Sequence, residues 1–318
     1  MNPLQARSVP LSTRRTLLLT LDAFGTIFYP RPPVPEQYTA IAHEFGLSAV
    51  TAPKLRSAFK DVYRAQAKRY PNYGRADVLR GKYGGPRQWW EEVIRGSFAH
   101  VLSGPEHVSQ DFELPVGMVD TLLDRFAGKG GYTLYDDVVP FFARMRELKR
   151  SPSLARDFDR VILGVISNSD DRVPAVLKEL GLKVGDLRAD QNLSSMQLPG
   201  FEQRIAHIGD LGGGPDVDVD MVITSYEAGE EKPHRLIFDV ARGQATLLAH
   251  NARTGSAVTG QEGTGDWVCV HVGDDYGKDY RAAIDAGWQS FLLRGDGQEH
   301  HAKSIDSLVD LVDELKIC

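Results

Sequence analysis

The sequence predicts an α/β protein in which a parallel sheet forms the core and a block of helices is inserted after the first strand. The prediction depends on three observations. Short apolar segments of strand length alternate with helical segments in the second half of the chain, which is typical of a parallel sheet covered by helices. A long stretch of helical pattern, residues 31–131, follows the first strand. Polar or charged residues stand directly after four of the expected strands.

The expected strands are short runs rich in leucine or β-branched residues. The first, residues 16–21, has the sequence TLLLTL and ends at Asp22. Later runs of similar length also have the composition of buried strands. They are residues 161–166, 217–224, 268–272 and 290–293.

The expected helices show apolar residues at helical spacing, such as Leu55, Phe59, Val62 and Tyr63 on one stripe. In the inserted block the helices are residues 34–45, 53–69, 86–102 and 114–126. Between and after the core strands they are residues 138–149, 173–180, 234–242, 279–286 and 305–315.

These elements divide the chain into two parts. Residues 14–30 and 132–318 form the core, and residues 31–131 form the helical insertion, called the cap below. Two further segments, 183–215 and 243–265, are rich in Gly and polar residues and exceed the usual length of a connection. We expect them to be flexible loop insertions.

Composition limits the class of protein. The chain has 318 residues, 42% hydrophobic and 25% charged, close to the average for a globular protein with a sizeable core. Its 37 Lys and Arg against 43 Asp and Glu give a net charge of −6, which argues against a nucleic-acid partner. No apolar run has the length of a membrane span, so no membrane partner is expected either. The oligomeric state does not follow from the sequence.

The cysteines and the first residues bear on the cellular compartment. Cys269 and Cys318 are too few for a disulfide framework, which favours a reducing, intracellular environment. Residues 1–15 contain arginines and no acid, a composition that also occurs in mitochondrial transit segments. They show no amphipathic helical stripe and contain Pro3 and Pro10. We therefore expect a cytoplasmic or nuclear protein, with mitochondrial import as the alternative.

The polar residues after the strands predict where a ligand binds. In a parallel α/β sheet, ligands occupy the crevice beyond the carboxyl ends of the strands. The segments that reach this edge are residues 22–26, 167–168, 230–233 and 273–279. Because each of them delivers polar or charged groups in chain order, we expect them to converge on one site.

The side chains of these segments suggest a hydrolytic site. Asp22, at the tip of a strand, is placed to act as a covalent nucleophile. Thr26, and Ser167 with its neighbour Asn168, offer polar groups to a phosphate or carboxylate oxygen. Lys232 supplies a positive charge that offsets the nucleophile and an anionic group of the substrate. We therefore expect a small, anionic substrate.

The last of the four segments adds carboxylates suited to a metal ion. Asp274 and Asp279 follow the fourth polar strand end, and with Asp22 they could hold a hard divalent cation. Mg²⁺ is the best candidate because it prefers oxygen ligands and keeps several waters.

This ordered set of four motifs resembles the haloacid dehalogenase (HAD) superfamily over nearly the whole chain. Within it, the segments 70–74, 87–90 and 273–276 look most like the group of haloacid dehalogenase-like hydrolase domain-containing protein 3. The resemblance implies a Rossmann-like core with an α-helical cap and a nucleophilic aspartate. It also implies that the backbone carbonyl of Phe24 is a further metal ligand.

One residue departs from the phosphatase members of this superfamily. They usually carry a second Asp two residues after the nucleophile, where it protonates the leaving group, and here that residue is Phe24. The motif at residues 22–26 instead resembles 2-haloacid dehalogenases, which release a halide without a metal ion, whereas Asp274 and Asp279 resemble the metal-binding phosphatases. We expect a Mg²⁺-dependent phosphatase of a small phosphate ester with weak general-acid help. The alternatives are a carbon–halogen hydrolase and a non-catalytic interaction protein.

Overall fold

The structure is a computed structural model of the chain. It describes residues 15–103, 113–151, 158–189, 214–254, 266–295 and 301–315. Most of the segment 1–15, most of the expected loop insertion 183–215, about half of the insertion 243–265 and Cys318 lie outside the described residues.

A seven-stranded parallel sheet forms the core of the described part of the chain, in the order β5-β6-β4-β1-β7-β8-β9. The strands are β1 (Arg15–Leu21), β4 (Arg160–Ser167), β5 (Val184–Leu187), β6 (Val219–Thr224), β7 (Asp266–Gly273), β8 (Gln289–Leu293) and β9 (Ser304–Ile305). Strand β1 lies in the middle and pairs with β4 and β7. The expected α/β fold with a parallel sheet is therefore confirmed.

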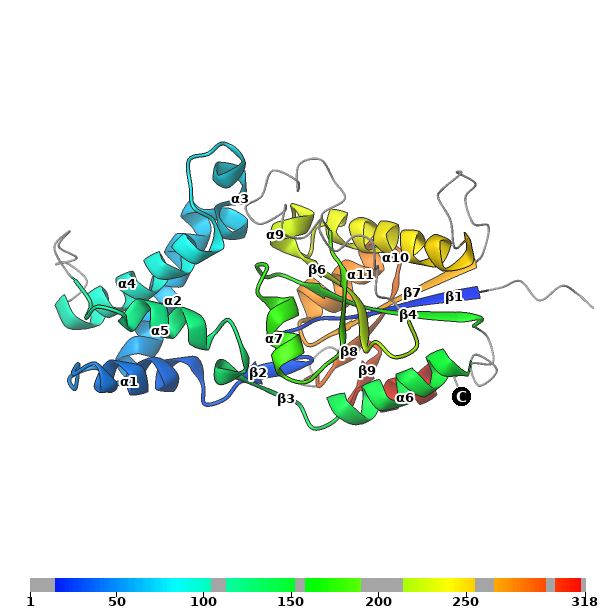
Figure 1. Ribbon diagram of the computed structural model, residues 1–318, viewed down its shortest axis with the longest axis horizontal. Helices are drawn as coiled ribbons and strands as arrows, with labels where there is room; N and C mark the ends of the chain where they lie inside the picture. The colour runs from blue at the N-terminus through cyan, green and yellow to red at the C-terminus, as the bar shows by residue number, and fades with distance from the viewer. Residues whose placement is uncertain are drawn as a thin grey trace, which may run out of the picture.

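Helices cover both faces of this sheet (Figure 1). On one face, Leu17, Leu19 and Leu21 of β1 pack in a cluster with α6 (Val138–Arg150), α7 (Val173–Glu179) and α12 (Asp310–Glu314). On the other face, Leu18 packs in a cluster with α10 (Leu236–Thr254) and α11 (Ala282–Asp285). The alternation along β1 follows from the two-residue period of a strand, and burial on both faces explains its continuous apolar sequence.

The cap is an all-helical unit at one side of the core (Figure 1). Its helices are α1 (Val34–Glu44), α2 (Ala52–Arg69), α3 (Pro71–Leu79), α4 (Pro86–Ser103) and α5 (Met118–Arg125). It has an apolar cluster of its own, which includes Tyr38, Ile94, Phe98 and Leu122. Two short antiparallel strands, β2 (Phe28–Pro30) and β3 (Tyr132–Leu134), carry the chain into the cap and back to the core.

Two parts of the expected loop insertions are regular structure. Strand β5 pairs with β6 at the edge of the sheet, within the segment 183–215. Helix α10 continues to Thr254 and so occupies the first half of the segment 243–265. The Gly and Thr residues there suggested a loop, but Ala and Leu residues sustain the helix, and Ala245 is fully buried.

Other elements differ from expectation where they are short. Instead of one helix over residues 305–315, the chain first adds strand β9 to β8 and then forms α12. A turn of π-helix, η4 (Tyr276–Arg281), precedes α11, and the four-residue helix α9 (Ser225–Ala228) follows β6. Elements of two to six residues leave too little periodicity for recognition in a sequence.

Among the helices of the described residues, none combines the length and the hydropathy that a membrane span requires.

Candidate active site

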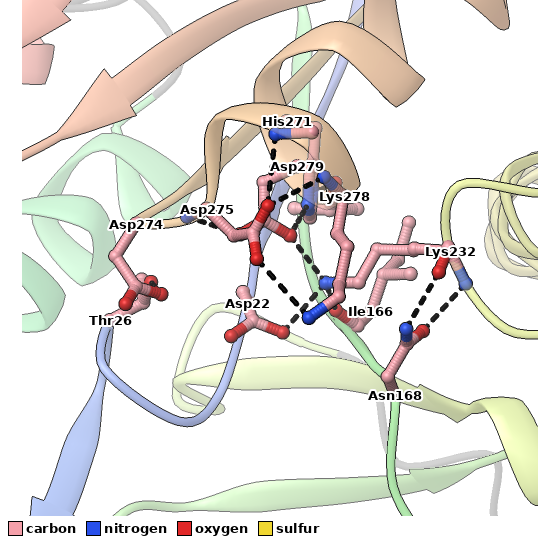
Figure 2. Close-up of polar contacts among 12 residues, drawn as sticks. Asp22, Thr26, Ile166, Asn168, Lys232, His271, Asp274, Asp275, Lys278 and Asp279 are labelled. Carbon is pink, nitrogen blue, oxygen red and sulfur yellow. Dashed lines mark hydrogen bonds and ion pairs between the residues drawn. The ribbon is translucent and has the colours of Figure 1, made fainter. Parts of the chain in front are cut away.

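Asp22 is at the carboxyl end of the central strand. Its backbone N–H donates to the carbonyl of Val272 at 2.8 Å, which continues the β1–β7 ladder by one residue. Its side chain is largely buried and lies 2.6 Å from the ammonium of Lys232, measured from Oδ1 to Nζ (Figure 2). The carboxylate therefore meets a cation at the edge of the sheet where the sequence predicted a site.

Lys232 is the buried centre of this site. Its Nζ donates to Asp22 Oδ1 and Asp279 Oδ1, each at 2.6 Å, and to the carbonyl of Ile166 at 2.8 Å (Figure 2). Asn168 fixes the backbone of the same residue: its Nδ2 donates to the Lys232 carbonyl at 2.8 Å, and its Oδ1 accepts from the Lys232 N–H at 2.6 Å. Asn168 therefore holds the lysine in place instead of presenting its amide to solvent.

The loop after β7 brings Asp274 against the loop after β1. Thr26 Oγ1 donates to Asp274 Oδ1 at 3.5 Å. Gly25 has a positive φ of 81°, and a Cβ built on it would lie 2.3 Å from Asp274 Oδ2. Any side chain at position 25 would be strained at this φ and would overlap Asp274, so only glycine fits there. A Cβ on Gly273 would likewise lie 2.2 Å from the Asp279 side chain, so two glycines make room for the two acids.

Asp279 is held from three sides. Besides Lys232, its Oδ1 lies 3.2 Å from His271 Nε2, and its Oδ2 accepts from the Asp275 N–H at 3.0 Å. His271 Nδ1 lies 2.9 Å from Thr20 Oγ1. A neutral imidazole can donate from Nε2 to Asp279 and accept at Nδ1 from the Thr20 hydroxyl, whose other acceptor, the Val270 carbonyl, lies farther away at 3.2 Å. Burial favours this form because it lowers the pKa of His271.

The role of His271 was not predicted from the sequence. Its ring contacts Phe238 edge to face, with centroids 5.3 Å apart. The hydrogen bond to Asp279 makes it a positioning residue as well. The sequence signal for this role was a polar residue inside a fully buried stretch of strand, eight positions before Asp279.

Burial sets the electrostatics of the site. It raises the pKa of the Asp22 carboxyl, against the opposing effect of Lys232, and it raises the pKa of Asp274 as well. Burial alone would raise the pKa of Asp279, but the positive charge of Lys232 holds it below its usual range. Burial would also lower the pKa of Lys232, but the two neighbouring carboxylates raise it, so the lysine stays protonated.

Three carboxylates form a group suited to a hard cation. Ligand atoms of Asp22, Asp274 and Asp279 all lie within 4.8 Å of one another. Oxygen ligands are what Mg²⁺ prefers in proteins. Both oxygens of Asp279 already accept hydrogen bonds, so Asp22 and the more exposed Asp274 offer the freer oxygens. The side chains present fit a bound divalent cation.

The predicted residues surround one polar pocket of about 230 Å³. It is lined by Asp22, Phe24, Ser167, Asn168, Lys232, Asp274, Asp275, Lys278 and Asp279. Thr26 is fully buried beside the pocket, where its hydroxyl contacts Asp274. The four strand ends thus converge as expected, while the chemical role of each residue stays a prediction.

Phe24 also borders a second cavity, which lies between the cap and the core. Its side chain is 38% exposed and makes edge contacts with Phe28 and Tyr132. Trp90 of the cap lines this cavity and donates from Nε1 to Asp170 Oδ2 at 2.7 Å. No sequence pattern predicts this contact between cap and core.

A buried carboxylate–lysine pair at the end of the central strand, two further acids after the neighbouring strand β7 and an inserted helical cap define a class. The class is that of hydrolases built on a parallel α/β sheet with a helical cap. No family model matches the chain, but comparison with individual proteins assigns a family.

The chain is 30% identical to the uncharacterized protein YMR130W of Saccharomyces cerevisiae over 322 aligned positions, covering 99% of this chain and 83% of the relative. It is 28% identical to haloacid dehalogenase-like hydrolase domain-containing protein 3 of Homo sapiens, covering 87% and 82% of the two chains. A solved structure of 2-haloacid dehalogenase from Pseudomonas syringae matches at a TM-score of 0.46 and 17% identity, covering 94% and 97%. The chain belongs to the haloacid dehalogenase-like hydrolases.

Proposed function

We propose that the chain is a Mg²⁺-dependent phosphatase that hydrolyses a small phosphate monoester through Asp22. The observation that carries the proposal is the balance of charge in the polar pocket. The three clustered carboxylates and one buried ammonium sum to a charge of −2 when all are ionised. A phosphate monoester is itself an anion, so it would be repelled unless a divalent cation enters with it.

In this mechanism an oxygen of Asp22 attacks phosphorus, and the bond from phosphorus to the ester oxygen breaks. Water then attacks the phosphorus of the aspartyl phosphate, which releases inorganic phosphate and restores Asp22. Lys232 orients the nucleophile by its 2.6 Å contact and offsets negative charge on the phosphoryl oxygens. Ser167, buried at the pocket wall, offers its hydroxyl to one of these oxygens.

Asp22 and Asp274, with Asp279 beside them, would hold the cation, and the Phe24 carbonyl is the further ligand that the family resemblance implies. When bound, Mg²⁺ supplies positive charge that offsets the phosphoryl oxygens.

Phe24 determines which esters react well. Its ring has no proton to give, so the leaving oxygen has to take its proton from water. Loss of a general acid typically costs ~10²–10⁴-fold in rate. The enzyme should therefore prefer esters with good leaving groups.

Turnover of 4-nitrophenyl phosphate with and without Mg²⁺ tests the proposal. Asp22→Asn should reduce the Mg²⁺-dependent rate by on the order of 10³-fold or more, because it removes the nucleophile but keeps the shape. Asp239→Asn, at an exposed ion pair with Arg235, is the matched control and should retain the wild-type rate. Equal turnover by Asp22→Asn and wild type would show that another group is the nucleophile.

Carbon–halogen hydrolysis is the second candidate, since Phe24 gives the first motif its dehalogenase-like form. The arginine nearest the cap cavity, Arg172, already makes hydrogen bonds with Asp170 through Nε (2.8 Å) and NH2 (2.7 Å). Because Arg172 is already paired with a carboxylate, it is a poor candidate for binding the halide that a dehalogenase releases. Halide release from 2-chloropropionate without Mg²⁺ would favour this candidate over the phosphatase.

A further inference from the structure

The cavity between cap and core is a separate space from the polar pocket, and its wall is predominantly apolar. The cap contributes aromatic side chains from several helices, among them Tyr38, Phe59, Tyr63 and Trp90. The core side includes Val173 and Val176 of α7. Such a wall favours an apolar occupant because removal of apolar surface from water stabilises a bound ligand.

The charged groups of the wall are already paired. Asp170 accepts from Arg172 and from Trp90 Nε1, at distances of 2.7–2.8 Å. Arg172 also lies over the Trp90 ring, 5.0 Å from its centroid, and its NH1 donates to the Phe126 carbonyl at 3.4 Å. Since Asp170 and Arg172 neutralise each other, a charged ligand group would enter an apolar space without a free counter-charge on the wall, which is unfavourable. The cavity therefore discriminates against charged ligands.

The unpaired polar groups of the wall are uncharged hydroxyls. The hydroxyl of Ser169 is buried and makes no hydrogen bond among the described residues, although its side chain lines the cavity. Tyr38, Tyr63, Tyr73 and Tyr132 belong to the same lining, and their hydroxyls make no hydrogen bond among these residues either. The wall therefore suits a group that is apolar over most of its surface and carries a few uncharged hydrogen-bonding atoms.

The volume limits the size of that group. The cavity measures about 230 Å³. An apolar cavity of about 150 Å³ holds benzene. The space thus accommodates an aromatic ring with a short alkyl extension, or a short alkyl chain.

Phe24 connects this cavity with the candidate nucleophile. It lies two residues after Asp22 and lines both the polar pocket and the apolar cavity. The loop after β4 does the same, because Ser167 and Asn168 line the pocket while Ser169 and Asp170 line the cavity. A molecule with a phosphoryl group in one space can extend its ester group past Phe24 into the other.

We propose that the substrate is a phosphate monoester of an uncharged, predominantly apolar alcohol or phenol, whose organic group fills the cavity between cap and core. This inference rests on the proposed phosphatase function and adds the class of leaving group. Sugar phosphates, nucleotides and phosphorylated amino acids fall outside the class.

A comparison of 2-phenylethyl phosphate with glycerol 3-phosphate tests the class of leaving group. Both are esters of primary alcohols, so leaving-group chemistry does not favour the apolar ester. Burial of a phenyl group should raise kcat/KM by about 10- to 100-fold for 2-phenylethyl phosphate over glycerol 3-phosphate. An equal or higher kcat/KM for glycerol 3-phosphate would overturn the inference and leave the phosphatase proposal intact.

A variant of the cavity wall, with a matched control, tests whether the preference for the apolar ester arises in this cavity. Tyr63, on α2, lines the cavity and is 38% exposed, so Tyr63→Glu places a charge at the wall without burying it fully. Leu247→Glu makes the same change on α10 at 36% exposure, outside the cavity lining. Tyr63→Glu should reduce the preference for the apolar ester about tenfold, and Leu247→Glu should keep it. Equal preference in both variants would contradict the assignment of this cavity.

Binding of 1-naphthol, measured by calorimetry, separates this inference from the phosphatase function. The wild type should bind it with a negative heat-capacity change, as burial of apolar surface requires, and Tyr63→Glu should bind it more weakly than Leu247→Glu. Binding without turnover of any phosphate ester would refute the phosphatase and keep the ligand class of the cavity. Turnover of a phosphate ester without binding of 1-naphthol would refute the ligand class of the cavity and keep the phosphatase function.

Discussion

Lys232→Met should destabilise the protein more strongly than any single surface change. The substitution keeps the length of the side chain but removes the cation that contacts Asp22 and Asp279, each at 2.6 Å. The lysine side chain is 2% exposed, so water cannot replace it at these carboxylates. Removal of one partner of a buried ion pair costs about 3–5 kcal/mol. In a chain of this size that corresponds to a fall in Tm of roughly 4–8 °C.

The loss of stability in Lys232→Met should change with pH in one direction. Without Lys232, burial is no longer opposed, so the folded-state pKa of Asp22, which is already raised, should rise further, and that of Asp279 should rise above its unfolded value. A carboxyl with a raised pKa in the folded state destabilises the fold as pH rises through the interval between the two pKa values. The difference in stability between wild type and variant should therefore be largest near pH 7 and shrink toward pH 5.

Thermal melts of metal-free protein at pH 5, 6 and 7 provide the assay. Lys178→Met is the matched control, since Lys178 pairs with Asp186 at 3.1 Å but both side chains are nearly half exposed. An exposed pair of this kind contributes about 1 kcal/mol at most. If Lys232→Met lowered Tm no more than Lys178→Met, or if its effect were the same at all three pH values, the charge argument would be wrong.

Three further outcomes are expected. Mg²⁺ should bind more weakly as pH falls from 8 to 6, because burial raises the pKa values of Asp22 and Asp274 and protons compete with the metal ion; calorimetric affinities that do not change over this range would contradict it. Phe24→Asp, at a side chain already 38% exposed, should raise turnover of alkyl phosphates by at least ~10-fold and of 4-nitrophenyl phosphate little; a drop in Tm with no gain on either ester would disfavour a phosphatase site. Trp90→Phe should cost about 1–3 kcal/mol in a denaturant melt by leaving Asp170 short of one hydrogen bond, and an unchanged midpoint would show that this contact contributes nothing.

The sequence predicted the parts of the fold that depend on long patterns. The buried strands β1, β4 and β7 and the long helices α2, α4 and α6 appear within one or two residues of their expected bounds. Short pieces such as β2, β3 and β9 could not be predicted, because they exist only through pairing with a distant segment. Helix α10 was predicted too short for a different reason: its later residues resemble a loop in composition.

The residues of the candidate site could be predicted from the sequence, but the contacts between them could not. Asp22, Lys232 and Asp279 follow strands whose ends must meet at one edge of a parallel sheet, and that rule needs no side-chain geometry. The bond from Asn168 to the Lys232 backbone depends on a meeting of two loops 64 positions apart. The contact of Trp90 with Asp170 depends on how the cap sits on the core. No local pattern encodes either of them.

The loop after β4 has a consequence for exchange of caps between related enzymes. Its residues 167–172 face the polar pocket at one end and contact the cap at the other, through Asp170 and Trp90. A foreign cap without a donor at the position of Trp90 would leave a buried carboxylate short of a partner, a few residues from the predicted phosphate-binding hydroxyl of Ser167. Cap and core of this protein are thus not independent modules. A chimera that keeps its catalytic geometry should need Trp90, Asp170 and Arg172 to be transferred as a set.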